Sequence, residues 1–285
     1  MTVNNMSGRM IVGGCSRWRA LWPVLAITWL TGLLSACTPW IAVTAGTAGP
    51  VGRTNRGVLV GGEALPKAGE GYAFYHDRDR RYGSAQLTAL VTEVAQKVAA
   101  DFPDSVLLVG DLSGNGGGKI TGHSSHRTGL DVDLAFFVRC PERTNTDAFL
   151  LAPHDPYGVT VSDGHAGYFD YEKNWAVVEA LLSSEAAQIQ WIFVSKGLKA
   201  RLLAYALSSG KNMDLVARAA DVLHQPGDSA IHNDHFHVRI YCPSIPDAPA
   251  CEQRKPQWPW VKAPRKTTPS SPSDETLLTL ALEGL

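Results

Sequence analysis

The sequence predicts an α+β domain in which an antiparallel sheet carries a polar site on one face and helices pack on the other. Two observations support this fold class. Two segments with strand-like alternation, residues 130–138 and 236–240, lie roughly a hundred residues apart. Segments with helical spacing alternate irregularly with strands, which favours α+β over a regular parallel arrangement.

The other elements follow in chain order. Apolar residues at helical spacing predict a helix over residues 84–101, and a strand is expected over 105–109. Further helices are expected over 175–182, 199–207 and 214–223, with a strand over 190–194. The Gly-rich stretch 114–118 lacks the Lys-Ser/Thr continuation of a phosphate-binding loop, so we interpret it as the flexible rim of a cleft.

Each of the two separated strands has one apolar and one polar face, because successive side chains of a strand point to opposite sides. The apolar residues are Leu130, Val132 and Leu134 in the first strand, and Phe236, Val238 and Ile240 in the second. The polar residues are Asp131 and Asp133 in the first strand, and His235, His237 and Arg239 in the second. If both apolar faces cover the same core, Asp133 and His237 converge on the opposite face.

His126, in the loop before the first of these strands, would complete a three-residue metal site with Asp133 and His237. Two imidazoles and one carboxylate leave a fourth tetrahedral position for water, which is typical of a catalytic zinc site. This ligand chemistry suits zinc better than calcium or magnesium. His235 points from the same face about 6 to 7 Å along the strand, where it can reach a substrate without binding the metal.

The motif around these residues resembles a known group of zinc peptidases. Residues 125–133, Ser-His-Arg-Thr-Gly-Leu-Asp-Val-Asp, with the downstream His235-Phe236-His237, are similar to lysostaphin-type enzymes, D-alanyl-D-alanine peptidases and the Hedgehog signalling domain. Within this group the sequence most resembles the penicillin-insensitive murein endopeptidase family, over roughly residues 55–255. The resemblance implies one zinc ion per chain on His126, Asp133 and His237, and hydrolysis of peptide cross-links in peptidoglycan without a serine nucleophile.

The same resemblance implies that His123, His232 and His235 line the cleft. We expect His235, His232 and Asp234 to be catalytic, with His235, or Asp234 assisting it, moving a proton and stabilising the developing oxyanion. Asp234 departs from the endopeptidase pattern, in which a neutral residue is expected. Carboxypeptidases and dipeptidases of the wider group have an acidic residue at this spacing.

Alternative interpretations remain for the function and for three residues. One rival is a zinc D,D-carboxypeptidase that removes terminal D-alanine, and a rival of another class is a noncatalytic zinc-binding or peptide-binding domain. The intact histidines of the second cluster argue against the noncatalytic domain. Asp131 is either a hydrogen-bond partner of a ligand imidazole or an exposed strand residue. Arg80 and Arg81 either belong to a solvated charged turn or bind a substrate carboxylate.

The N-terminus has the features of a secretory signal peptide. Arg9, Arg17 and Arg19 precede an uncharged apolar run over residues 20–34, which is short for a membrane span. The run closes on Leu-Ser-Ala-Cys at residues 34–37, which resembles a lipoprotein box with Cys37 as the acylated residue. The alternative is an ordinary secretory signal with an incidental cysteine. We expect a periplasmic protein anchored to the membrane through lipidated Cys37.

Charge and cysteines limit the partners and the redox state. Removing residues 1–36 takes away three of the 26 basic residues and none of the 27 acidic ones, so the net charge falls from −1 to about −4. No basic field remains for nucleic acid, and peptidoglycan peptides are the expected partner. In an oxidising envelope Cys242 and Cys251 can form a disulfide that closes a short loop, leaving Cys140 unpaired.

The chain divides into four expected segments. Residues 1–36 form the signal peptide, residues 37–60 a tether, residues 61–255 the zinc metallopeptidase domain, and residues 256–285 a Pro-rich, disordered tail.

Overall fold

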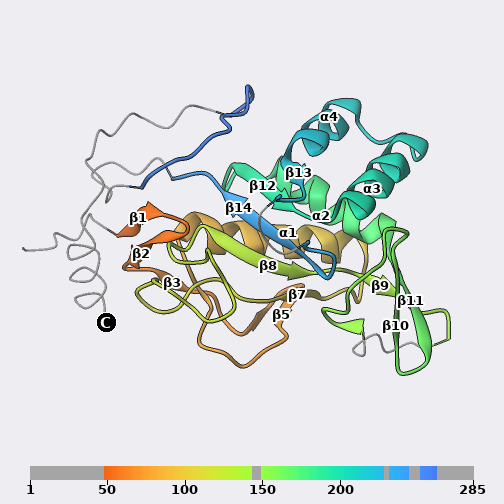
Figure 1. The fold of residues 1–285 in the computed structure, drawn as a ribbon, viewed down its shortest axis with the longest axis horizontal. Coiled ribbons are helices and arrows are strands. Elements are labelled where there is room, and N and C mark those ends of the chain that lie inside the picture. The colour runs from red at the N-terminus through yellow and green to blue at the C-terminus, as the bar shows by residue number, and fades with distance from the viewer. Residues whose placement is uncertain (1–47, 143–148, 228–230, 244–250, 262–285) are drawn as a thin grey trace, which may run out of the picture. The chain divides into compact units, whose positions relative to one another are not determined.

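The structure, a computed structural model, describes residues 48–142, 149–227, 231–243 and 251–261. The predicted α+β class is confirmed, with helices packed on a seven-stranded sheet whose strand order is β13-β12-β14-β8-β7-β5-β4 (Figure 1). The predicted signal peptide and Cys37 lie outside the described residues. Within the described ranges, no helix is long and apolar enough to cross a membrane.

The central strands of this sheet are antiparallel, as predicted, but the sheet as a whole is mixed. Its strands are β4 (Ala68–Gly69), β5 (Tyr72–Phe74), β7 (Leu107–Val109), β8 (Asp131–Ala135), β12 (Ile189–Phe193), β13 (Leu223–His224) and β14 (His235–Ile240). β14 pairs antiparallel with both β8 and β12, whereas the pairs β5–β7 and β12–β13 are parallel. Each parallel pair is joined through helices, because a parallel connection needs a crossover.

The helices begin at polar capping residues that the sequence provides. They are α1 (Ala85–Asp101), α2 (Tyr171–Ser183), α3 (Lys196–Ser208) and α4 (Met213–Val222). Ser84, Asp170, Ser195 and Asn212 each accept a hydrogen bond from a backbone N–H of the first turn. The four predicted helices are therefore confirmed, although α2 and α3 begin several residues before their apolar repeats, at the capped turn.

The core lies between the helices and one face of the sheet. In Figure 1, α1 runs behind β8 and β14. Val132 and Leu134 of β8, and Phe236 and Val238 of β14, are fully buried in one cluster with residues of all four helices. The opposite face of the same two strands carries the aspartates and histidines, as the alternation predicts. The strand expected over 130–138 ends at Ala135, and Phe137 instead exchanges two hydrogen bonds with the Asn174 side chain of α2.

Residues 49–60 belong to the folded domain, so the predicted tether is wrong in this part. They form a hairpin of β1 (Gly49–Arg53) and β2 (Arg56–Val60), whose valines make a small core of their own. The hairpin is bound to distant segments: Leu59 N–H donates to Gly116 O at 3.0 Å, and Glu252 N–H donates to Gly52 O at 2.9 Å. The remainder of the predicted tether lies outside the described residues, except for Ala48.

Residues 256–261 also differ from the expectation, since they pack on the domain instead of beginning a tail. Trp258 and Trp260 stack at 5.6 Å between ring centroids and contact the core, and Trp258 Nε1 donates to Gln190 O at 2.8 Å. The predicted Cys242–Cys251 disulfide is confirmed and ties the end of β14 to this segment, while Cys140 is a buried free cysteine. Residues 262–285 lie outside the described ranges.

Three smaller strand pairings surround the main sheet. β3 (Glu63–Ala64) pairs with β6 (Tyr82–Gly83), and β9 (Val138–Arg139) extends the hairpin of β10 (Val159–Ser162) and β11 (His165–Phe169). The β3–β6 pair leads directly into α1 and brings Arg80 and Arg81 close to the loop that follows β7.

Candidate active site

The polar faces of β8 and β14 meet in register. Asp133 pairs directly with His237, and His235 pairs with Ala135. Side chains directly opposite each other in an antiparallel pair lie on the same face, so the aspartate and the histidine point to the same space. His126 reaches this space from the loop before β8, where its backbone adopts φ 64°.

Three side-chain atoms converge here as the sequence predicts. His126 Nε2 lies 3.2 Å from Asp133 Oδ1 and 3.4 Å from His237 Nδ1, and His237 Nδ1 lies 3.4 Å from Asp133 Oδ1. Atoms bound at zinc distances around a tetrahedral centre are separated by about 3.4 Å. Asp133 Oδ1 is buried and makes no hydrogen bond within the described part of the chain. A buried carboxylate needs a compensating positive charge, so the three residues fit a cation.

The imidazoles of His126 and His237 are oriented by hydrogen bonds from their other nitrogens. His126 Nδ1 lies 2.7 Å from Leu112 O, and His237 Nε2 lies 2.9 Å from Asp131 Oδ1. When these nitrogens donate, the nitrogens that face the site keep their lone pairs.

Asp131 is fully buried and accepts three hydrogen bonds. This decides between the two interpretations of Asp131 that the sequence left open. Besides His237, Arg239 Nε donates to its Oδ1 at 2.6 Å, and the His126 backbone N–H donates to its Oδ2 at 3.3 Å. Asp131 is therefore a buried partner of the His237 imidazole and of the His126 backbone, and not an exposed strand residue.

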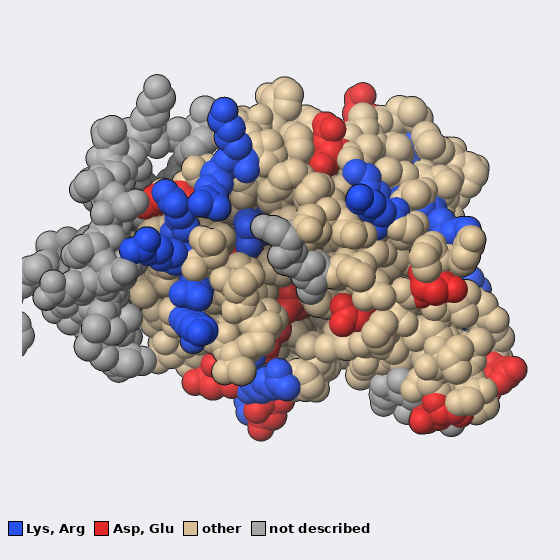
Figure 2. Space-filling model, in the orientation of Figure 1, with Lys and Arg blue, Asp and Glu red and all other residues tan. Residues whose placement is uncertain are grey.

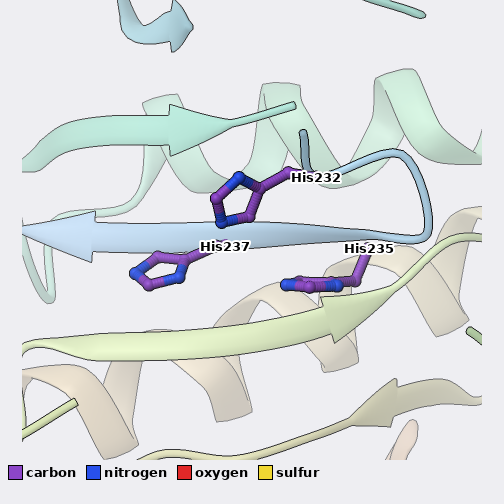
Figure 3. Close-up of side chains that lie close together, drawn as sticks. All are labelled: His232, His235 and His237. Atoms are coloured by element: carbon purple, nitrogen blue, oxygen red, sulfur yellow. The ribbon is translucent and has the colours of Figure 1, made fainter. Parts of the chain in front are cut away.

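His232 and His235 lie beside His237, as expected for cleft residues. Figure 3 shows the His235 and His237 rings next to each other along β14, with His232 reaching over from the preceding segment. The His232 ring centroid is 5.4 Å from each of the other two. His235 Nδ1 contacts Asp234 Oδ1 at 2.7 Å, and its Nε2 lies 3.4 Å from Asp133 Oδ1.

Two groups of side chains in the described structure have donor atoms close enough to share a metal ion. One is His123, His126 and Asp133, and the other is His232, His235 and His237. The set of His126, Asp133 and His237 takes residues from both groups, because the Asp133–His237 pairing joins them. Its mutual separations of 3.2 to 3.4 Å and its oriented imidazoles make it the set that best fits one ion.

Electrostatics favour the metal-binding charge states of Asp133 and His237, whereas at His126 burial lowers the pKa but the charges of Asp133 and Asp131 outweigh it and raise the pKa. Burial raises the pKa of Asp133, but the neighbouring His126 and His235 outweigh it and hold the pKa well below its usual range. Burial and the nearby His126 lower the pKa of His237 to about 4, which favours a neutral imidazole. Metal ligands must be a carboxylate and neutral imidazoles, so both shifts favour binding.

Asp111 is a site residue that the sequence reasoning missed. Its Oδ2 lies 2.9 Å from His123 Nε2 and accepts from Arg80 Nη1 at 2.8 Å. Arg80 Nη1 also lies within hydrogen-bonding distance of Thr121 O, at 2.9 Å. Arg80 therefore reaches the site through Asp111, with a guanidinium that is already engaged. The position of Asp111, just after the strand 107–109, is the signal that would have indicated it.

The structure separates Arg81 from this network. Its Nη1 donates to Leu65 O at 3.1 Å, and its guanidinium lies 5.7 Å from the centre of the Tyr82 ring. Within the described part of the chain, none of its recorded contacts is with the histidine and aspartate cluster. The contacts of Arg81 are those of a structural residue.

Tyr75 is a second residue that the sequence did not indicate. A Cβ added to Gly110 would lie 3.2 Å from the Tyr75 hydroxyl oxygen and 3.1 Å from Asp133 Cβ, so the phenol stands beside the aspartate. Burial, together with the charges of Asp133 and Asp111, raises the pKa of Tyr75. The hydroxyl therefore keeps its proton at neutral pH and can donate a hydrogen bond.

The Gly-rich stretch expected to form a flexible rim precedes the His126 loop and is closely packed at Gly117. Gly117 has φ 74°, and a Cβ there would lie 2.2 Å from Arg127 O and 2.4 Å from Leu59 N. In the same turn, Gly118 N–H donates a hydrogen bond to Arg127 O at 2.9 Å. Glycine at this position lets the backbone of β2 approach the residue that follows His126.

Basic side chains gather on and around the β1–β2 hairpin. Figure 2 shows Lys and Arg concentrated on the part of the face that carries β1 and β2, where Arg53 also forms an ion pair with Glu252. Arg53 and Arg56 are paired residues of that hairpin. Arg127 N–H donates to Thr54 O at 3.3 Å, which places the arginine after His126 beside the hairpin turn.

Comparisons of the sequence with known proteins identify its family. A family model described as penicillin-insensitive murein endopeptidase matches residues 50–261. A protein of that name from Haemophilus influenzae is 35% identical over 217 residues, which cover 74% of this chain and 69% of the relative. Proteins of the same name from Klebsiella pneumoniae and Escherichia coli are 30% and 28% identical, over 83% and 85% of this chain and 82% and 92% of their own lengths. This chain belongs to the penicillin-insensitive murein endopeptidase family.

Proposed function

We propose that this protein is a zinc-dependent murein endopeptidase that cleaves peptide cross-links between D-alanine and a diamino acid in peptidoglycan. The observation that carries the proposal is the convergence of three buried side-chain atoms, His126 Nε2, Asp133 Oδ1 and His237 Nδ1, at mutual distances of 3.2 to 3.4 Å. Family membership supports the reaction class, and the ligand chemistry supports zinc.

His126, Asp133 and His237 would hold the ion. When bound, zinc would supply polarisation of the scissile carbonyl and a water of lowered pKa. Leu112 O and Asp131 keep the two imidazoles in the tautomer that presents a lone pair to the ion. A serine nucleophile has no part in this scheme, which is consistent with insensitivity to penicillins.

His235 is placed to carry the proton chemistry. Burial opposes a charged ring, but Asp133 and Asp234 outweigh it and raise the pKa of His235 to about 10. The Asp234 carboxylate holds Nδ1, so Nε2 faces the site with its proton. A cationic ring in this position stabilises negative charge on the carbonyl oxygen and can protonate the leaving amine from Nε2.

Other side chains would position the substrate. The Tyr75 hydroxyl stands beside Asp133 and can donate to a substrate oxygen. His123 is held by Asp111, and His232 lies against His235 and His237. The basic side chains near β1 and β2 would attract stem peptides, which carry several carboxylates.

The test is digestion of purified sacculi by the mature protein, with released fragments identified by mass. We expect cross-linked muropeptide dimers to become monomers in the presence of penicillin, and the reaction to stop with a zinc chelator and to resume when zinc is restored. The His126→Ala variant is the inactive control. A protein that binds muropeptides and zinc without cleaving dimers would instead be a noncatalytic binding domain.

A D,D-carboxypeptidase is the second candidate, because Asp234 contacts His235 at 2.7 Å. An acidic residue at this spacing is the feature that resembles the carboxypeptidase branch. We rank the endopeptidase first, since the family match extends over residues 50–261 and one side chain can alter a proton path without altering which substrate fits.

We also propose that the protein is a periplasmic lipoprotein anchored through Cys37. The basic and apolar pattern of residues 9–34, followed by Leu-Ser-Ala-Cys, supports this proposal. Metabolic labelling with a fatty acid tests it. Cys37→Ala should lose the label and either leave the membrane fraction or remain unprocessed, and unchanged labelling of this variant would exclude Cys37.

A further inference from the structure

Aromatic side chains of β12 continue the sheet face that carries the candidate metal site. Phe193 pairs directly with His237 of β14, and Trp191 pairs with Arg239. Directly paired side chains of antiparallel strands lie on the same face, so both rings are on the face of the metal site. This face is therefore polar on β8 and β14 and becomes aromatic on the next strand.

The rings form a row that begins at the metal site. The Phe193 ring centroid lies 5.2 Å from that of His237, and the Trp191 ring follows at 6.0 Å from Phe193. Trp258 continues the row at 5.3 Å from Trp191. His224 of β13 flanks it at 4.7 Å from Trp191. These four residues, Phe193, Trp191, His224 and Trp258, are called the aromatic row below.

The hydrophobic core does not account for Trp191. The main apolar cluster of the described structure takes Ile189 and Ile192 from β12, and Trp191 is not among its residues. Trp191 and Trp258 remain partly exposed, and His224 is exposed. Indoles that stay partly in water on the face of the site have apolar surface left to bury against a ligand.

The outer tryptophan of the row is held in place by the domain itself. Trp258 Nε1 donates to Gln190 O at 2.8 Å, and the Trp258 backbone N–H donates to Tyr241 Oη at 3.0 Å. Trp260 stacks on Trp258 with the two ring planes 7° apart. A ring that is already fixed loses little conformational entropy when a ligand binds, which favours affinity.

We propose that the aromatic row binds an N-acetylhexosamine of the glycan strand to which the cleaved stem peptide is attached. A pyranose ring presents a face of C–H groups, which suits the negative π-face of an indole. Its hydroxyl and N-acetyl groups project from the rim, where the exposed His224 offers ring nitrogens. The inference rests on the proposed function, which supplies the peptidoglycan substrate, and adds recognition of the sugar to it.

The extent of the row matches the length of a stem peptide. An extended peptide spans about 3.3 Å per residue, so the three or four stem residues between the cleaved bond and the sugar span roughly 10 to 13 Å. Trp191 is two ring-to-ring steps from His237, and Trp258 is three. A stem whose scissile bond lies at the metal site therefore brings its sugar to Trp191 or Trp258.

Binding of a sugar without any peptide is the first test. The probe is chitotriose, an uncharged trimer of N-acetylglucosamine, titrated into the full mature protein by calorimetry. An uncharged probe excludes a contribution from the basic side chains near the β1–β2 hairpin. We expect saturable binding that is about tenfold weaker in Trp191→Ala, because less apolar surface is removed from water. Tyr157→Ala, at a tyrosine that is 65% exposed and outside the row, should bind as wild type does.

Cleavage of two matched substrates is the second test. One is a cross-linked muropeptide dimer with its disaccharides, and the other is the same dimer after an amidase has removed them. Wild type should show a KM about tenfold lower for the sugar-bearing dimer, with a similar kcat. Trp191→Ala should lose this difference while its KM for the bare peptide dimer stays unchanged, which also shows that the variant is folded. Trp191→Phe, which keeps a flat ring, should retain most of the preference.

The outcomes separate this inference from the proposed function. Absence of chitotriose binding in wild type, equal KM for the two dimers, or an equal rise of both KM values in Trp191→Ala would each overturn the sugar site and leave the endopeptidase in place. Failure of wild type to cleave either dimer would overturn the endopeptidase. Chitotriose binding that is weakened in Trp191→Ala would still support the sugar site in that case.

Discussion

Asp133 of β8 and His237 of β14 are direct partners across two antiparallel strands, and Asp133 Oδ1 lies 3.4 Å from His237 Nδ1. The pairing brings together residues that are distant in sequence, and it needs only His126 from a nearby loop to complete a three-residue site. The consequences can be checked one side chain at a time.

Removal of any one ligand should abolish metal binding. We expect one zinc per chain in the wild type, and His126→Ala, Asp133→Ala and His237→Ala should each lose zinc and fall to background activity, because two ligands hold zinc poorly. His235→Ala is the matched variant, which should keep its zinc and lose turnover. Elemental analysis of the dialysed proteins measures this. Full zinc retention in Asp133→Ala would contradict the ligand assignment.

Asp131 should act on the metal indirectly, through the histidines that it holds, His237 and His126. Asp131→Asn leaves the volume nearly unchanged but removes the charged acceptor of His237 Nε2 and Arg239 Nε, so zinc affinity should fall roughly 10- to 100-fold. Competition with a chromogenic chelator gives the affinity. Arg239→Lys is the control, since it keeps a cation beside Asp131, and its zinc affinity should change less. An unaltered affinity in Asp131→Asn would show that the contact does not orient the ligand.

Asp234 should assist catalysis without determining the substrate. Asp234→Ala removes the group that holds His235 Nδ1, and kcat on dimers should fall roughly tenfold, less than the 10²- to 10⁴-fold effect of a direct proton donor. Wild type should release little free D-alanine from pentapeptide monomers. If D-alanine release is abundant, dimers remain intact, and Asp234→Ala abolishes activity, the carboxypeptidase becomes the better assignment.

Asp111 should make the free energy of unfolding depend on pH. Burial raises its pKa, but contacts with His123 and Arg80 outweigh this, and the pKa falls below the usual 3.8. The folded state therefore keeps this group ionised where the unfolded state is already protonated. Its stabilising contribution is fully present above about pH 3.8 and is lost as pH falls through the folded-state pKa. The measurement is urea unfolding of the metal-free protein at pH 5 and below. As pH falls, the free energy of unfolding should decrease less in Asp111→Asn than in wild type.

The Cys242–Cys251 bond should stabilise the end of the domain. It closes a loop with a sequence separation of 9, for which chain entropy gives about 2 to 3 kcal/mol. Cys242→Ser with Cys251→Ser should lower the free energy of unfolding by about this amount, as measured in urea under nonreducing conditions. Cys140→Ser, at the buried free cysteine, is the control for a general cysteine effect. Equal stability of wild type with and without reductant would argue that the bond contributes little.

Local patterns in the sequence were sufficient to predict the helices and the polar residues that face the candidate site. The apolar repeat of α1 and the alternation in β8 and β14 report which face of each element is buried, since burial of apolar surface drives folding. The same alternation places Asp133 and His237 on the face away from the core, so their convergence on one side of the sheet could be predicted from the sequence.

Only the tertiary structure decided how distant segments meet. The register that pairs Asp133 with His237, the approach of Asp111 and Tyr75, and the packing of the β1–β2 hairpin and Trp258 all depend on contacts between residues far apart in the chain. Such contacts result from the packing of the whole domain, and no local pattern of polarity specifies them. Asp131 shows the difference most clearly: its position on the strand was evident from the alternation, but its burial between His237 and Arg239 was decided by the neighbouring strand.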